Sequence, residues 1–132
     1  MNKISLLLIV ALFTHCASPT PAPKAENGTD AAREFIRAAL DGDYDKAAIY
    51  MVKDSINDQL LKQQDENYKG LKMIDQNNFK NASIRPTAIR KENDSVIYFS
   101  YYHSAHTTDT TTLRVLLKNG KWLVDLKSVI KM

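Results

Sequence analysis

The chain has 132 residues, of which 25% are charged, and its formal net charge is +3 at pH 7. This length is typical of a single domain. Lys and Arg are scattered among acidic residues, so there is no basic patch for a nucleic acid and we expect no such partner. The single cysteine excludes a disulfide within the chain.

The chain begins with a basic residue and a short apolar run. Lys3 precedes residues 4–13, which are almost all apolar. A run of this length matches the apolar core of a secretory signal, which spans about 7–15 residues. It is too short for a transmembrane helix, which needs about 20 residues. We therefore expect residues 1–15 to be a signal peptide.

Cys16 follows this segment directly. Residues 13–16, Phe-Thr-His-Cys, resemble the lipobox of bacterial lipoproteins, although Phe13 and His15 replace the usual Leu and small residue. The resemblance implies that the Cys16 thiol is acylated after cleavage before it, which gives a lipid anchor in the membrane. Cleavage by an ordinary signal peptidase, or an uncleaved anchor, remains the alternative.

Residues 16–28 are expected to form a flexible tether. They contain three prolines and small polar residues without apolar periodicity. Such a composition buries too little surface to offset the entropy of ordering. The two residues after Cys16 are not acidic, which favours the outer membrane, facing the periplasm, over retention in the inner membrane. Residues 29–132 are then left as one folded domain.

Helical periodicity follows the tether. Thr29 or Asp30 is suited to cap a first helix, and Gly42 is suited to the left-handed position that ends it. The apolar face of this helix comprises Ala32, Phe35, Ile36, Ala39 and Leu40. Asp43 can cap a second helix, which would bury Tyr44, Ala47, Ala48 and Met51.

A third helix is expected to begin near Asp54 or Ser55. Its apolar stripe is weak: it consists of Ile56 and Leu60, with Leu61 and Tyr68 as further candidates. Residues 62–67 are strongly polar. We therefore expect this helix to be largely exposed.

From about Phe79 the apolar period changes to two, which predicts strands over residues 83–90, 95–103, 110–118 and 121–129. Pro86 places the first strand at an edge or a bulge, since proline cannot donate to the ladder. Asn119-Gly120 predicts a type I′ turn. Helices followed by an antiparallel meander predict an α+β fold with the helices packed on one sheet face.

Alternation assigns the faces of these strands. Trp122, Val124 and Leu126 are expected to point to the core, and Asp125 to solvent. The strand over residues 95–103 is apolar on both faces, which indicates either burial on both sides or a binding surface on one.

Two segments resemble a known group of proteins. Residues 32–47 combine an apolar helix with Gly-Asp-Tyr and Lys-Ala, and residues 113–125 place Asn-Gly-Lys-Trp between two strands. Over residues 30–129 the chain resembles small bacterial lipoproteins with a nuclear transport factor two-like (cystatin-like α+β) domain. The resemblance implies N-terminal helices packed on a curved, cone-like, four-stranded antiparallel sheet. It implies no activity, because this superfamily contains both enzymes and binding domains.

Aromatic residues are concentrated in two of the expected strands. Tyr98, Tyr101, Tyr102 and Trp122, together with His103, form the candidate ligand or partner surface. Aromatic side chains with polar tips are typical of binding surfaces. They are equally favoured by strand packing, which is the competing interpretation.

The chain carries no recognisable catalytic constellation. His103, His106 and Asp109 lie near a turn, but without a helix to align them they are weak metal ligands, so we expect no metal and no cofactor. We interpret the two histidines as exposed turn residues and name no catalytic residue.

The leading hypothesis is a membrane-anchored periplasmic lipoprotein whose non-catalytic domain binds a protein partner or a small apolar ligand. The alternative is a small hydrolase or isomerase that uses His103 or Asp125 in a pocket.

Overall fold

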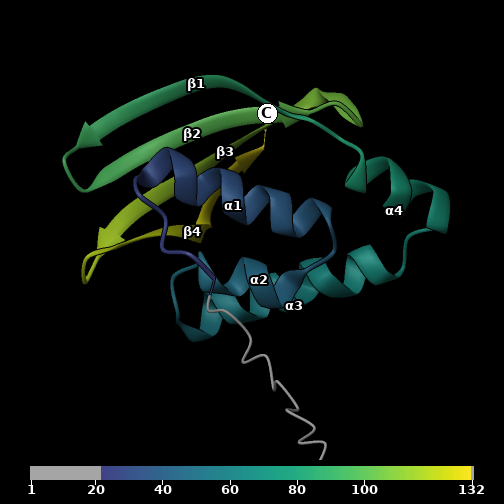
Figure 1. The fold of residues 1–132 in the computed structure, drawn as a ribbon, viewed down its shortest axis with the longest axis horizontal. Helices are drawn as coiled ribbons and strands as arrows, with labels where there is room; N and C mark the ends of the chain where they lie inside the picture. Colours follow the sequence, from purple (N-terminus) through teal and green to yellow (C-terminus); the bar gives the residue numbers. More distant parts are fainter. Residues whose placement is uncertain (1–21, 132) are drawn as a thin grey trace, which may run out of the picture.

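The computed structural model describes residues 22–131, with side chains to residue 129. The expected signal peptide, Cys16 and the first part of the tether lie outside the described residues. Within the described part, four helices precede four strands (Figure 1), which confirms the α+β class. The helices are α1 (Gly28–Leu40), α2 (Tyr44–Ile49), α3 (Ser55–Lys69) and α4 (Met73–Lys80). The strands are β1 (Ile84–Asn93), β2 (Val96–His103), β3 (His106–Lys118) and β4 (Lys121–Lys131).

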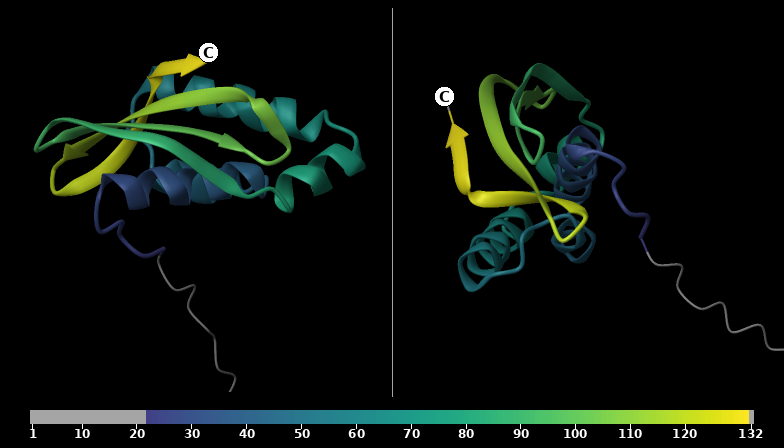
Figure 2. Two further views of the ribbon diagram at one scale, coloured as in Figure 1. Left: turned by 90° about the horizontal axis from the view of Figure 1, so that it is seen from above. Right: turned by 90° about the vertical axis from the view of Figure 1, so that its left-hand side faces the viewer.

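The four strands form one antiparallel sheet in the order β1-β2-β3-β4, and the sheet is not closed. Irregularities in register lie between Pro86 and Ala88 and between Thr112 and Arg114, among other places. Such bulges bend strands and increase their twist, and Figure 2 shows a strongly twisted, curved sheet. The edge position expected from Pro86 is confirmed. Strand β3 begins at His106, earlier than expected, because His106 pairs with His103 of β2.

The core lies between α1 and the inner face of the sheet. Phe35 and Ile36 of α1 are buried there with Phe99, Val115 and Val124 of three different strands. Gly28 lets α1 approach the sheet closely, since a Cβ on it would lie 2.7 Å from the Ile97 Cδ1 atom. Burial of this apolar surface is the main force that holds α1 on the sheet.

Strand β4 is covered on both faces. Val124 faces the core, whereas the next residue, Asp125, contacts Asn57 of α3 and is only 6% exposed. Figure 2 shows α1 and α3 on opposite sides of β4. The expectation that Asp125 faces solvent was therefore wrong. The outer edge of β4 is also occupied, because Val52 N donates to Val124 O at 2.9 Å and Val124 N donates to Tyr50 O at 2.7 Å.

One expected helix cap is confirmed, because the carboxylate of Asp43 accepts the Lys46 N–H. Helix α3 begins at Ser55, as expected, and the Asp54 carboxylate caps it by accepting the Asn57 N–H. The expected cap of α1 is corrected. Helix α1 is capped by Asn27, whose side chain accepts the Asp30 N–H at 2.9 Å, and not by Thr29 or Asp30. Asn at the N-cap position, with an extended backbone, accepts such a bond as readily as Asp does.

The end of the expected tether lies against the domain. Ala25 is buried, and the Tyr50 hydroxyl donates to Pro23 O at 2.9 Å. Gly28 already belongs to α1. The ordered body thus includes residues that composition alone assigned to the tether.

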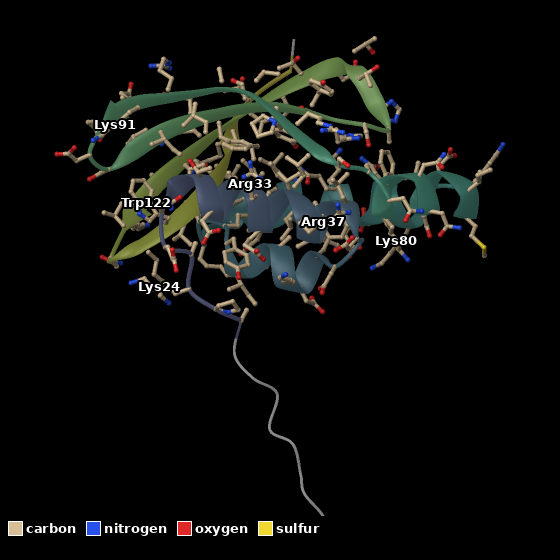
Figure 3. All side chains as sticks on the ribbon, turned by 45° about the horizontal axis from the view of Figure 1, so that its top comes forward. Lys24, Arg33, Arg37, Lys80, Lys91 and Trp122 are labelled. Carbon is tan, nitrogen blue, oxygen red and sulfur yellow. The ribbon has the colours of Figure 1, made fainter. Side chains whose placement is uncertain are left out.

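Helix α4 was not expected from the sequence. None of its residues is buried, so the sequence shows no apolar stripe that would identify a helix, and no side chain caps its N-terminus. A side chain of another helix fixes its C-terminal end. The Arg37 guanidinium of α1 donates to the carbonyl oxygens of Phe79, Lys80 and Ala82 at 3.2, 3.1 and 2.7 Å. Figure 3 shows Arg37 at the end of α1 that faces Lys80.

The turn between β3 and β4 has the predicted conformation. Asn119 has φ 51° and Gly120 has φ 73°, the two left-handed residues of a type I′ turn. No helix within residues 22–131 is long and apolar enough to cross a membrane.

Candidate functional site

A row of aromatic rings lines the end of the molecule where α4 lies. Tyr44 and Tyr68 meet edge to face with ring centroids 6.0 Å apart, and Tyr68 and Phe79 follow at 6.3 Å. Phe79 contacts His103 at 5.4 Å and His106 at 5.5 Å. We call these five residues the aromatic row. They come from α2, α3, α4, β2 and β3, so only the tertiary structure brings them together.

Local hydrogen bonds fix the helices that carry the row. Gln76 Nε2 of α4 donates to Tyr68 O at 3.0 Å, which ties the start of α4 to the end of α3. The Tyr68 hydroxyl donates to Leu40 O at 3.4 Å and joins α3 to α1. His103 and His106 pair across the β2–β3 hairpin, with their rings perpendicular at 5.4 Å. The row therefore rests on rigid elements and not on a free loop.

Two hollows lie along the row. The tyrosine hollow has a volume of about 310 Å³ and is lined by Tyr44, Gln64, Asn67, Tyr68, Leu71 and Phe79. The histidine hollow has a volume of about 300 Å³ and is lined by Leu71, Asp75, Asn78, Phe79, Ala105 and His106. Both share Leu71 and Phe79, so they are neighbours, and we call them together the α4 groove. Each is at the small end of ligand pockets, which range from about 300 to 1,000 Å³.

Two titratable groups of the row, Tyr44 and His103, are uncharged near neutral pH. Burial, reinforced by Asp65 and Tyr68, raises the pKa of the Tyr44 phenol to about 12. Burial, followed by the neighbouring His106, lowers the pKa of His103, and Asp109 opposes this shift. The Nδ1 atom of His103 is shielded from solvent and has no hydrogen-bond partner among the described residues. His103 is thus a half-buried neutral ring, not the exposed turn residue that we expected.

The structure does not bring His103 and Asp125 together. The Asp125 carboxylate lies beneath α3, where it accepts from Asn57 Nδ2 at 3.2 Å and from Arg114 at 3.4 Å. The His103 ring packs on Phe79 and His106. No hydrogen bond in residues 22–131 joins His103 to Asp125, so no acid–base pair forms between them. The described residues also contain no group of three or more His, Cys, Asp or Glu placed to hold a metal ion.

The other residues of the expected surface lie on different sides of the molecule. Tyr98 is covered by the Arg90 guanidinium at 4.2 Å, on the sheet face away from α1. Tyr101 lies on the opposite face against Phe99, and burial raises its pKa to about 12. Tyr102 is half-buried and alternates with Tyr101, which places it on the side of Tyr98.

Trp122 is at the far end of β4 from the aromatic row. It lies beside Lys24 (Figure 3) and lines a hollow of about 100 Å³ against the N-terminal segment. Of the five residues expected to share one surface, only His103 belongs to the aromatic row.

Sequence reasoning missed most of the α4 groove. Tyr44 was assigned to a helix core and Tyr68 to a weak stripe, while Asp75 and Asn78 lie in a segment without a pattern. The available signal was the alignment of Asp75, Asn78 and Phe79 at helical spacing.

Comparisons with known proteins do not identify a function, so the function is argued from the geometry of the site. No protein-family model matches the chain, and a search of curated proteins found no match.

Proposed function

We propose that this protein is a lipid-anchored lipoprotein of the cell envelope whose domain binds a small ligand, or an apolar side chain of a partner, in the α4 groove without catalysing a reaction. The domain is proposed to belong to the nuclear transport factor two-like superfamily, with a cone-like sheet. Four helices ahead of a four-stranded antiparallel sheet support this assignment. The anchor is proposed on Cys16 and faces the periplasm from the outer membrane.

The observation that carries the binding proposal is the pair of adjoining hollows along five aromatic rings. Ligand sites combine apolar and aromatic walls with a few convergent polar groups. The walls here are Leu71 and Phe79, and the polar groups are the side chains of Asn67, Asp75 and Asn78. Tyr44 and His103 are uncharged near neutral pH, and His103 lacks an acidic hydrogen-bond partner among the described residues that would activate it, which favours binding over acid–base catalysis.

The binding proposal is tested by NMR titration of the mature chain carrying Cys16→Ser, with toluene as the probe. We expect saturable shifts confined to the α4 groove, that is, to residue 44 and to residues 64–79 and 103–106. Phe79→Leu should weaken binding, because it removes the ring shared by both hollows. Tyr102→Leu, outside the groove, is the matched control and should bind as before. Shifts centred on Trp122 instead would reject the α4 groove as the site.

The anchor is tested by mass spectrometry of the mature N-terminus after expression in a Gram-negative host. We expect a diacylglyceryl group on Cys16. In the Cys16→Ala variant we expect no acylated N-terminus. An unmodified N-terminus elsewhere would remove the anchor from the proposal and leave a secreted domain.

A further inference from the structure

Asp75 differs from the other partly buried acidic residues of the domain in having no partner among the described residues. Within residues 22–129, five further Asp and Glu side chains are at least partly buried, and each has a hydrogen-bond or ion-pair partner: Asp30, Glu34, Asp54, Asp65 and Asp125. Asp75 is also partly buried, but no described residue pairs with its carboxylate. Because the unpaired oxygens of Asp75 are not among the solvent-shielded atoms of the domain, the carboxylate still meets solvent at the wall of the hollow and can pair with a cationic ligand without first breaking an internal ion pair.

The surroundings of Asp75 are apolar and aromatic. Asp75, Asn78 and Phe79 share one face of α4, and this face lines the histidine hollow opposite Ala105 and His106. The rings of Phe79 and His106 are 5.5 Å apart and inclined by 35°. Aromatic faces attract cations through their quadrupole, and desolvation strengthens this attraction. The carboxylate of Asp75 thus lies beside aromatic rings that can bind both a hydrocarbon group and a cation.

This combination discriminates between ligand classes. An anion would be repelled by Asp75. A neutral ligand that filled the hollow would remove the remaining water from the carboxylate without replacing its hydrogen bonds. A cation with an apolar body pairs with the carboxylate and also covers Leu71 and Phe79, while Asn78 can accept a hydrogen bond from an N–H group.

We propose that the histidine hollow binds a small organic ammonium ion, with the positive charge beside Asp75 and the hydrocarbon part against Phe79 and His106. This inference rests on the proposed function, because it names the ligand class of the same groove. The hollow, of about 300 Å³, admits a compact ammonium head and not a large cofactor.

The test uses three probes of matched shape on the mature chain carrying Cys16→Ser. The cation is benzyltrimethylammonium, its neutral isostere is neopentylbenzene, and the anion is benzenesulfonate. In NMR titrations at pH 7.5 we expect the cation to saturate shifts at residues 75–79 and 105–106. We expect the neutral isostere to bind at least about tenfold more weakly, and the anion not to bind there.

Asp75→Asn keeps the shape of the side chain and removes its charge. It should raise the Kd for benzyltrimethylammonium about tenfold or more, corresponding to the loss of about 1.4 kcal/mol. Asp58→Asn is the matched control, because Asp58 is an exposed carboxylate of α3, and should leave the Kd unchanged. Urea unfolding of both variants establishes that each is folded.

The outcomes separate this inference from the proposed function. If neopentylbenzene binds the groove as tightly as the cation, or if Asp75→Asn leaves the Kd unchanged, the ammonium proposal is overturned and the groove remains a site for neutral ligands. If neither these probes nor toluene shift residues 71–79, the proposed function itself fails.

Discussion

The Asn57 side-chain amide of α3 donates to the Asp125 carboxylate of β4 at 3.2 Å. The Asn57 side-chain oxygen accepts the Leu126 N–H at 2.7 Å, and the residue is fully buried. One side chain therefore supplies both a donor and an acceptor to β4 beneath α3. It also supplies one of the hydrogen bonds to the buried Asp125 carboxylate, whose other partners are Arg114 and the Lys127 N–H.

Replacing Asn57 should destabilise the domain strongly. Asn57→Ala leaves the Leu126 N–H without a partner and removes one of the two hydrogen bonds to Asp125 Oδ1, the other coming from the Lys127 N–H. An orphaned buried group costs about 1–3 kcal/mol. We expect the free energy of unfolding in urea to fall by at least about 2 kcal/mol. Gln59→Ala, at an exposed position of the same helix, should change it by less than about 0.5 kcal/mol. A loss below about 1 kcal/mol for Asn57→Ala would show that water replaces its bonds.

Gly42 and Gly120 form a matched pair for substitution. Both have left-handed backbones, with φ 74° and 73°, so alanine should cost about 1–2 kcal/mol at either position. At Gly42 a Cβ would also overlap the Tyr68 ring, with its Cζ 2.9 Å away, whereas at Gly120 the nearest atom is Lys24 Nζ at 3.9 Å. Thermal unfolding should show Gly42→Ala to be the more destabilising by about 1 kcal/mol or more. Equal losses would contradict a rigid Tyr68.

Acid unfolding should depend on Asp54. The backbone N–H of Asn57, followed by Lys127, lowers the pKa of this carboxyl from 3.8 to about 2. A lowered folded-state pKa contributes stability that is complete above pH 3.8 and is lost as the pH falls toward 2. We expect the difference in urea midpoint between wild type and Asp54→Asn, which keeps a capping oxygen, to shrink as the pH is lowered from 5 to 2. A constant difference would contradict the linkage.

His103 should make the domain less stable in mild acid. Burial and the neighbouring His106 of β3 lower its pKa from 6.5, Asp109 of β3 opposes this shift, and Phe79 of α4 packs on its ring. Because the folded-state pKa lies below the unfolded value, the unfolded chain binds the proton more readily. Stability therefore falls as the pH drops through 6.5.

The matched variant is His103→Gln, which cannot titrate in this range. Urea midpoints measured between pH 8 and 5 should fall less steeply for His103→Gln than for wild type, while His106→Gln changes the slope less. The same slope in wild type and His103→Gln would show that His103 gains a proton as easily in the folded state as in the unfolded chain.

Features that depend on neighbours in the chain were predictable from the sequence. Four such features are the cap at Asp43, the start of α3 near Asp54, the Asn119-Gly120 turn and the edge strand containing Pro86. Each follows from hydrogen bonds or dihedral angles within a few residues. The α+β class followed from the change of apolar period. Cys16 lies outside the described residues, so its anchor stays a prediction.

The candidate site was decided by contacts between distant segments. Helix α4 has no apolar stripe of its own and is fastened by Arg37, whose carbonyl partners lie 42 to 45 residues away. Asp125 is buried only because α3 crosses the far face of β4. Successive side chains of a strand point to opposite faces of the sheet, so Tyr98 and Tyr101 of β2 lie on different faces and do not form the single surface expected from their proximity in sequence. Local preferences therefore determined the elements, whereas the α4 groove and the unpaired Asp75 arose only from packing α4 against the β2–β3 hairpin.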